Sequence, residues 1–129
     1  MRLEGKTAVI TGGGTGIGQG IAQAYAAEGC KVIIAGRREE PLQAAADAWN
    51  GAGEMLYHTM DVSCLDSVKG FFAWVAENVG QIDILVNSAG TNIPNRTMEA
   101  MKPEQWDQVM AINASGAYYT MYEVLPQMR

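Results

Sequence analysis

The chain has 129 residues and a formal charge of −5, and 48% of its residues are hydrophobic. This length fits one soluble domain. The acidic balance gives no general attraction to nucleic acid or to anionic lipid surfaces, so we expect neither as a partner. The apolar runs, such as residues 71–76, fall well short of the roughly 20 residues that cross a bilayer, and no membrane span is expected.

The N-terminal segment contains charged side chains and a glycine, without the apolar stretch of a secretory signal. A cytoplasmic location is therefore expected. The two cysteines, Cys30 and Cys64, are far apart and lack CxxC spacing, so we expect both to remain reduced thiols. His58 has no second ligand at a suitable spacing, and no metal site is predicted.

The first half of the chain alternates short β-rich runs with longer helical patterns. Residues 7–10 form an apolar run typical of a buried strand. The helix that follows presents one apolar face, made by Ile17, Ile21, Ala24 and Tyr25. A second strand is then predicted at residues 31–35, and a second helix over residues 42–49 from its apolar residues at helical spacing.

The second half continues this alternation. A third strand at residues 55–60 precedes a helix over 65–79, for which Ser63 is the expected N-cap. A fourth strand at 82–86 is followed by a helix over 103–128 that is apolar nearly all round in its second half. Strands that alternate with helices predict an α/β fold, a doubly wound parallel sheet (Rossmann fold) with four strands and four main helices.

Between the first strand and the first helix lies a glycine-rich loop, Thr11-Gly12-Gly13-Gly14-Thr15-Gly16-Ile17-Gly18. Without β-carbons, such a turn lets a pyrophosphate approach backbone N–H groups and the positive end of the helix dipole. A tight turn without a ligand is the alternative, which the strand, loop and helix context disfavours. ATP or GTP is also disfavoured, because Gln19-Gly20 follows where a P-loop has lysine and serine or threonine.

This loop is one of four ordered motifs at the expected positions of the fold. The other three are Asp61-Val62 after the third strand, Asn87-Ser88-Ala89-Gly90 after the fourth, and Asn113 in the last helix. With these motifs the chain closely resembles the short-chain dehydrogenases/reductases from its first residues to its last. The resemblance implies hydride transfer between a nicotinamide dinucleotide and a carbonyl or alcohol substrate, such as a small ketone, a sugar-like polyol or a 3-oxoacyl thioester.

The resemblance also implies how the cofactor would be held. Its pyrophosphate and adjoining ribose would contact the glycine loop through Gly12, Gly14, Thr15, Gly16, Ile17 and Gly18. Asp61 and Val62 would hold the edge of the adenine.

Further roles fall on the fourth strand and the last helix. Asn87, Ala89 and Gly90 would lie along the cofactor toward the nicotinamide, with Asn87 also bracing the central strands. Asn113 matches the family's helix-kinking asparagine, whose displaced carbonyl group holds a water in the proton relay; without that match it would be taken as an ordinary polar helix residue. Ser88 replaces the family's usual second asparagine, and little functional loss is expected, since serine also bonds to nearby backbone.

The end of the second strand favours NADP(H) over NAD(H). An acidic residue that grips the ribose 2′-hydroxyl of NAD is expected about 20 residues beyond the glycine loop, but Gly36 stands there. Arg37 and Arg38 follow and can pair with a 2′-phosphate through charge-assisted contacts. The alternative is that both arginines are solvated charges balanced by Glu39 and Glu40.

The catalytic pair that the resemblance implies is absent, because no tyrosine of the chain is followed by a lysine four residues later. Residues 1–129 are therefore expected to be an NAD(P)-binding domain that stops before a fifth strand. Three interpretations stay open. The chain is the N-terminal half of a longer reductase, a second chain or swapped copy completes its sheet, or it is a non-catalytic nucleotide-binding or interaction module.

The substrate side and the assembly are less defined. The loop over residues 91–96 is expected to form one wall of the substrate cleft, because ligands bind beyond the carboxyl ends of the strands. The apolar surface of the last helix predicts a homo-oligomer or a completing chain.

Overall fold

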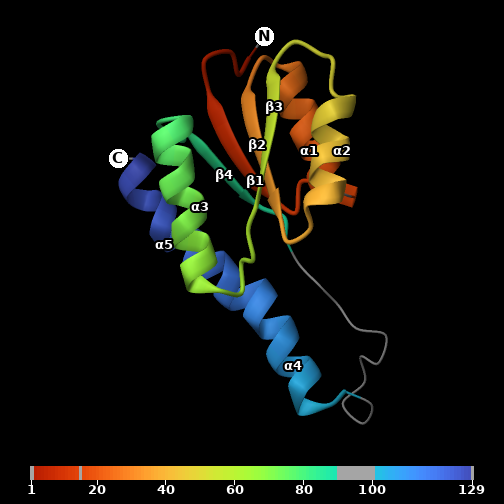
Figure 1. The fold of residues 1–129 in the computed structure, drawn as a ribbon, viewed down its shortest axis with the longest axis vertical. Coiled ribbons are helices and arrows are strands. Elements are labelled where there is room, and N and C mark those ends of the chain that lie inside the picture. The colour runs from red at the N-terminus through yellow and green to blue at the C-terminus, as the bar shows by residue number, and fades with distance from the viewer. Residues whose placement is uncertain (1, 15, 90–100, 129) are drawn as a thin grey trace.

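The computed structural model describes residues 2–14, 16–89 and 101–128. Strands and helices alternate along the chain (Figure 1), in the order β1 (Thr7–Thr11), α1 (Gly16–Ala27), β2 (Lys31–Gly36), α2 (Glu39–Ala48), β3 (Glu54–Thr59), α3 (Leu65–Asn78), β4 (Ile84–Asn87), α4 (Pro103–Met110), the π-helical turn η1 (Ala111–Ser115) and α5 (Gly116–Met128).

The four strands form one parallel sheet in the order β3-β2-β1-β4. The central strand β1 pairs with β2 from Thr7↔Lys31 onward and with β4 from Ala8↔Ile84 onward. Reversal of the strand order at β1 is the mark of a doubly wound sheet. The predicted fold class is therefore confirmed.

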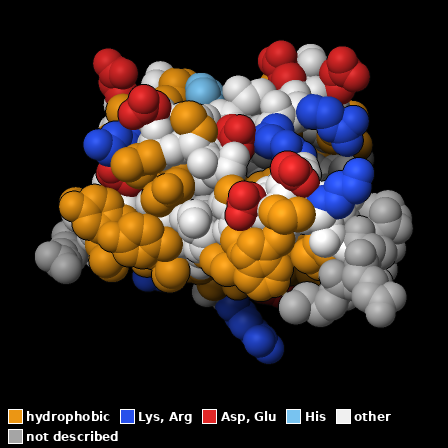
Figure 2. All heavy atoms as spheres, turned by 90° about the horizontal axis from the view of Figure 1, so that it is seen from below, with side chains coloured by type: hydrophobic (Ala, Val, Ile, Leu, Met, Phe, Trp, Pro, Cys, Tyr) orange, Lys and Arg blue, Asp and Glu red, His pale blue; other side chains and the backbone are white. Residues whose placement is uncertain are grey.

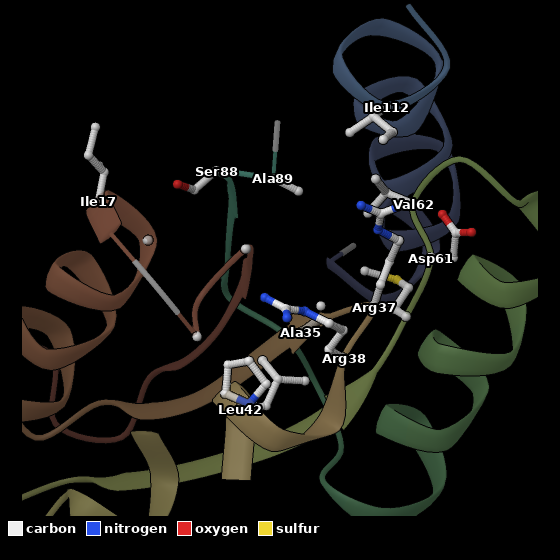
Figure 3. Close-up of a pocket in the computed structure, with 16 residues that line it drawn as sticks. Ile17, Ala35, Arg37, Arg38, Leu42, Asp61, Val62, Ser88, Ala89 and Ile112 are labelled. Atoms are coloured by element: carbon white, nitrogen blue, oxygen red, sulfur yellow. The ribbon is translucent and has the colours of Figure 1, made fainter. Parts of the chain in front are cut away.

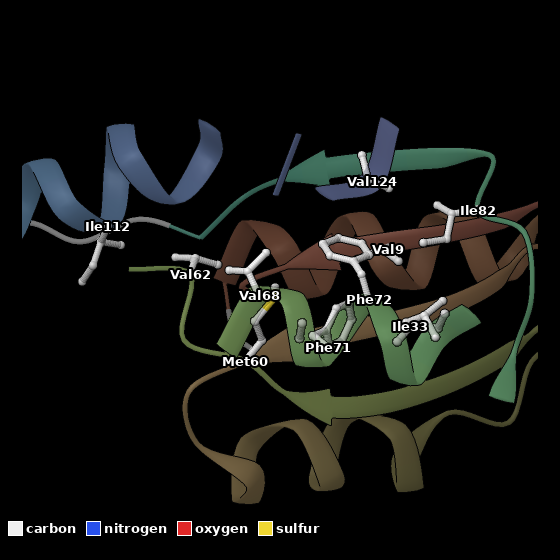
Figure 4. Packing of buried hydrophobic residues seen from close by; sticks show 12 residues of the cluster. Val9, Ile33, Met60, Val62, Val68, Phe71, Phe72, Ile82, Ile112 and Val124 are labelled. Atoms are coloured by element: carbon white, nitrogen blue, oxygen red, sulfur yellow. The ribbon is translucent and has the colours of Figure 1, made fainter. Parts of the chain in front are cut away.

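Each face of the sheet buries its own hydrophobic cluster. Ala8, Ile10, Val32 and Ile34 pack with Ala22 and Ala26 of α1 and with Leu42 and Ala45 of α2. On the opposite face, Val9 and Ile33 pack with side chains of α3 and α5, among them Val68, Phe71, Phe72, Val75 and Val124 (Figure 4). Because β1 and β2 are covered on both faces, their sequences read as continuous apolar runs rather than alternating ones.

Helix α1 packs on the sheet through small residues, which corrects the predicted face. Gly18, Ala22 and Ala26 are its buried residues, whereas Ile17 is 80% exposed and Ala24 is exposed. The prediction weighted large apolar side chains, but glycine and alanine allow the helix axis to approach the strands closely. The predicted face is therefore wrong in Ile17 and Ala24.

The predicted N-cap of α3 is also wrong. The helix begins at Leu65 with Cys64 in the capping position, and no side chain forms a capping hydrogen bond there. Ser63 instead donates its hydroxyl to Asp61 Oδ1 at 2.6 Å, so its side chain is engaged with the preceding residues. A hydrogen bond from the Ser63 hydroxyl to a carboxylate is charge-assisted, and it is therefore stronger than a hydrogen bond from a helix N–H group to that hydroxyl.

The last predicted helix is two helices. Pro103 stands in the first turn of α4, as expected, and Lys102 N donates to Gln105 Oε1 at 2.9 Å just before it. At residues 111–115 the backbone widens into the π-helical turn η1, and α5 continues from Gly116. π-Helical turns are rare and concentrate at functional sites. None of the helices in the described ranges is long and apolar enough to cross a bilayer.

Candidate functional site

A cleft of about 650 Å³ opens at the carboxyl ends of the strands. In the view of Figure 3, Ile17 lies on one side and Asp61, Val62 and Ile112 on the other. The full lining comes from the glycine loop, the end of β2, the start of α2, the segment after β3, the segment after β4 and η1: Gly12, Gly14, Ile17, Gly18, Ala35, Gly36, Arg37, Arg38, Pro41, Leu42, Met60, Asp61, Val62, Ser88, Ala89 and Ile112.

The glycine loop forms one wall by means of close backbone approaches. Gly12 has φ +67°, and a β-carbon on it would lie 3.0 Å from Cα and N of Ala89 and from the Ser88 carbonyl oxygen. A β-carbon on Gly18 would collide with the carbonyl oxygen of Gly12. The loop thus folds back against its own helix and against the segment after β4, which requires glycine at both positions.

Helix α1 begins within the glycine-rich loop, and its first turn carries no acidic side chain. Unpaired N–H groups at the start of a helix carry a partial positive charge, and an acidic residue there would neutralise it. Its absence leaves the helix terminus electrostatically suited to a phosphate group.

Thr11 joins the glycine loop to the segment after β4, which packs directly against it. Its hydroxyl oxygen accepts hydrogen bonds from the backbone N–H groups of Ser88 at 3.1 Å and Ala89 at 3.0 Å. The side chain is only 1% exposed. Sequence reasoning gave this residue no role of its own, although its position directly before the first glycine was a signal for one.

The end of β2 supplies the charged part of the lining. Gly36 lies half-buried at the last position of the strand, and Arg37 and Arg38 follow as exposed side chains. In the part of the chain that the structure describes, neither guanidinium forms an ion pair with Glu39 or Glu40. Both arginines border the cleft as solvent-exposed charges.

The segment after β3 holds a carboxylate in a fixed orientation. Asp61 Oδ1 accepts hydrogen bonds from the backbone N–H of Ser63 at 3.0 Å and from its hydroxyl at 2.6 Å. The backbone N–H of Asp61 donates to Ser67 Oγ at 2.9 Å. Val62, beside it, is 7% exposed and lines the cleft. Ser63 is thus a supporting residue that sequence reasoning assigned to a different task.

Three predicted residues lie in the described structure but outside this lining. Asn87 accepts a hydrogen bond from the Thr120 hydroxyl at 2.7 Å, so its side chain ties β4 to α5. Asn113 lies in η1 and is exposed, while its neighbour Ile112 lines the cleft. Gly16, with φ +58°, also stands outside the lining and shapes the turn into α1.

Some predictions cannot be compared with the fold. Thr15, Gly90 and the expected substrate-cleft loop at residues 91–96 lie outside the described residues. Across residues 2–14, 16–89 and 101–128, no group of three or more His, Cys, Asp or Glu side chains is arranged to hold a metal ion.

Leu42, Met60 and Ile112 are lining residues that no motif indicated. All three are nearly fully buried, and their spacing marks them only as core residues. They add apolar surface to the lining of the cleft.

The cleft fits a dinucleotide in its volume and in its chemistry. Its size lies within the range of about 300–1,000 Å³ that is usual for small-molecule sites. A glycine cradle at a helix N-terminus suits a pyrophosphate, apolar walls suit an adenine ring, and a carboxylate suits its amino group. An open parallel sheet with such a cleft at its reversal point defines the dinucleotide-binding class of α/β proteins.

The chain belongs to the short-chain dehydrogenase family, because residues 6–129 match the family model described as short chain dehydrogenase. It is 38% identical over 128 residues to the D-beta-hydroxybutyrate dehydrogenase of Cupriavidus necator, a match covering 98% of this chain and 49% of that protein. The predicted resemblance is confirmed, and the family implies a nicotinamide dinucleotide as cofactor.

Solved structures give the same result. A short-chain dehydrogenase/reductase from Mycobacterium ulcerans superposes with a TM-score of 0.89 at 26% identity, over 98% of this chain and 47% of that one. RhlG from Pseudomonas aeruginosa, in a complex with NADP, superposes with a TM-score of 0.85 at 30% identity, over 97% of this chain and 47% of that one. The chain spans about half the length of these relatives.

Proposed function

We propose that this chain is the cofactor-binding half of an NADP(H)-dependent short-chain dehydrogenase. The observation that carries the proposal is the cleft itself, in which a glycine loop at a helix N-terminus, two exposed arginines and an oriented carboxylate border one cavity. These are the groups that a pyrophosphate, a ribose 2′-phosphate and an adenine respectively require.

Each part of the cofactor has a candidate site on this chain. The pyrophosphate would accept hydrogen bonds from backbone N–H groups of the loop around Gly14 and Ile17, where α1 begins. Asp61 would accept a hydrogen bond from the adenine amino group, held ready by Ser63. Ser88 and Ala89 would border the half of the molecule that leads to the nicotinamide. The bound cofactor would supply the hydride that is exchanged with a carbonyl or alcohol carbon.

The preference for NADP(H) rests on Gly36, Arg37 and Arg38. Glycine brings no negative charge to repel a 2′-phosphate, and the guanidinium groups offer planar pairs of donors to its oxygens. RhlG, whose structure contains NADP, is a relative with the same fold.

Reduction also requires an acid near the substrate oxygen, and these 129 residues contain no tyrosine followed four residues later by a lysine. We therefore expect the chain by itself to bind NADPH without turnover. Asn113, in η1, would act in the proton relay once the partner groups are present. A non-catalytic nucleotide-binding module is the second candidate.

The remaining parts of the proposal concern the substrate, the assembly and the compartment. The substrate would be a small carbonyl or alcohol compound, and the compartment the cytoplasm. Hydrophobic side chains gather on the face seen in Figure 2. Helices α4 and α5 expose the large apolar side chains Trp106, Met110, Tyr118, Met121, Tyr122 and Leu125. A second copy or a completing chain would cover them.

The test is a titration followed by NADPH fluorescence. NADPH should bind more tightly than NADH, and Arg37→Ala should weaken NADPH binding about tenfold, since a charge-assisted contact contributes about 1.5–3 kcal/mol when sheltered and less when exposed. NADH binding should change little. Arg2→Ala removes an exposed arginine outside the cleft and is the matched control. Tighter binding of NADH, or unchanged NADPH affinity in Arg37→Ala, would overturn the cofactor assignment.

A further inference from the structure

The start of α5 makes an unusually close approach to the candidate adenine site. Gly116, the first residue of α5, is buried directly after η1. A β-carbon on Gly116 would lie 2.7 Å from Val62 Cγ2, 3.0 Å from Val62 Cβ and 3.1 Å from the Val62 carbonyl oxygen. Carbon atoms in contact stay about 3.5–4.0 Å apart, so any larger residue would force one partner to move.

Val62 has little freedom to move alone. Its β-branched side chain is stiff at χ1, and it is 7% exposed. Its neighbours are fixed by hydrogen bonds from Ser63 to Asp61 Oδ1 and from the backbone N–H of Cys64 to the Asp61 carbonyl oxygen at 3.1 Å. A shift of Val62 would therefore also shift the carboxylate of Asp61.

Helix α5 is equally constrained. One turn beyond Gly116, the fully buried Thr120 donates its hydroxyl to Asn87 Oδ1 at 2.7 Å. Val124, 2% exposed, lies in the same hydrophobic cluster as Val62. Because these contacts hold α5 against the sheet, the strain of a side chain at position 116 would fall largely on Val62.

The contact sets the shape of one wall of the cleft. Ile112 in η1 and Val62 after β3 both line the cleft and belong to one buried cluster. Figure 3 shows the two side chains on the same side of the cavity. The contact between Gly116 and Val62 fixes the distance between η1 and the segment after β3.

We propose that Gly116 is a positioning residue for the adenine end of the cofactor cleft, an inference that rests on the proposed function. The absence of a side chain lets α5 close on Val62, and this contact holds Asp61 and Val62 in the arrangement that binds the adenine. Gly116 also lies three residues after Asn113, so the same contact fixes the turn that carries Asn113.

The first test is a double-mutant cycle read by NADPH titration. Gly116→Ala should weaken NADPH binding about tenfold, because overpacking a fixed contact strains the wall. Val62→Ala removes Cγ2, the atom closest to position 116. In that background, Gly116→Ala should lower NADPH affinity by less than about threefold. Gly70→Ala is the matched control, since Gly70 is exposed in α3 and a β-carbon there would have no heavy atom within 4 Å. Unchanged NADPH affinity in Gly116→Ala would overturn the inference. So would a double variant whose loss of affinity is simply the product of the losses in the two single variants.

The second test needs no cofactor. Amide hydrogen exchange at Asp61 and Cys64, whose N–H groups donate to Ser67 Oγ and to the Asp61 carbonyl oxygen, should quicken in Gly116→Ala and stay unchanged in Gly70→Ala. If the wild-type protein binds no NADPH, the proposed function fails, and this exchange alone decides the positioning role. If Gly116→Ala does not fold, the double variant with Val62→Ala should restore folding, and a failure to do so counts against the inference.

Discussion

The two sides of the cleft are built by different means, and two buried threonines show how. Thr11, on the glycine-loop side, holds two backbone N–H groups, while Thr120, on the helix side, donates to the exposed side chain of Asn87. The first side is made of backbone in fixed conformations. The second depends on helices that also expose large apolar residues such as Trp106 and Tyr122. The glycine-loop side is thus held by hydrogen bonds to backbone, and the helix side by contacts between side chains.

The largest expected effect is on the glycine-loop side. Gly18→Ala places a β-carbon against the Gly12 carbonyl oxygen, and that backbone cannot retreat because Gly12 itself packs closely on Ala89. We expect NADPH affinity to fall about a hundredfold or more, equivalent to about 2.7 kcal/mol. Gly20→Ala in the same helix is the control, since nothing lies within 4 Å of its β-carbon position. Equal NADPH affinity in Gly18→Ala and Gly20→Ala would mean that the glycine loop is not rigid.

The threonine pair gives an intermediate effect and a direct test of the comparison. Thr11→Val leaves two backbone N–H groups without their acceptor, so it should lower the free energy of unfolding by about 2–3 kcal/mol and also weaken NADPH binding. Thr120→Val leaves only an exposed amide oxygen that water can reach, and about 1 kcal/mol is expected. Urea unfolding measures both variants. A larger loss for Thr120→Val would reverse the assignment of the two sides.

The smallest effect lies away from both sides, at Cys30 before β2. Burial raises the pKa of the Cys30 thiol above its ordinary value; a hydrogen bond at Ala8 opposes the rise, and the charge of Asp83 adds to it. Below the ordinary thiol pKa, Cys30 is neutral in both the folded and the unfolded chain, so it adds no pH dependence to the free energy of unfolding. Above it the unfolded chain ionises first, so the free energy of unfolding should fall with rising pH by at most about 1.4 kcal/mol per unit.

Urea unfolding between neutral pH and pH 10, compared with Cys30→Ala, isolates this contribution from other titrating groups. The exposed Cys64 is the matched control, and Cys64→Ala should retain the full pH dependence. NADPH affinity should be the same in all three proteins. A Cys30→Ala profile parallel to that of the wild type would contradict the expectation.

The parts of the fold that follow from local rules were readable from the sequence. The four strands, the glycine loop and the positions of Arg37, Arg38 and Asp61 at strand ends depend on short-range patterns, and the structure confirms the fold that they predicted. The position of the helix break at residues 111–115 could only be implied by the family's asparagine.

Other features depend on how the folded chain places neighbouring groups, which periodicity and capping rules do not describe. The buried face of α1 is set by closeness to the sheet, which periodicity does not measure. Ser63 bonds to Asp61 because the turn after β3 brings them together, and capping rules cannot foresee that competition. The contact between Gly116 and Val62 joins residues more than fifty positions apart, so no local pattern announces it.

The central place of β1 has a consequence for the order in which the molecule folds. This strand pairs with β2 soon after it is made, but its other partner, β4, begins only at Ile84. Strands this far apart in the sequence pair slowly. During synthesis, the side of β1 that pairs with β4 stays unpaired until β4 has emerged. Because Thr11 takes its two N–H partners from Ser88 and Ala89, the glycine loop reaches its final form only when β4 docks. Competence to bind a dinucleotide should therefore be among the last properties that the folding chain acquires.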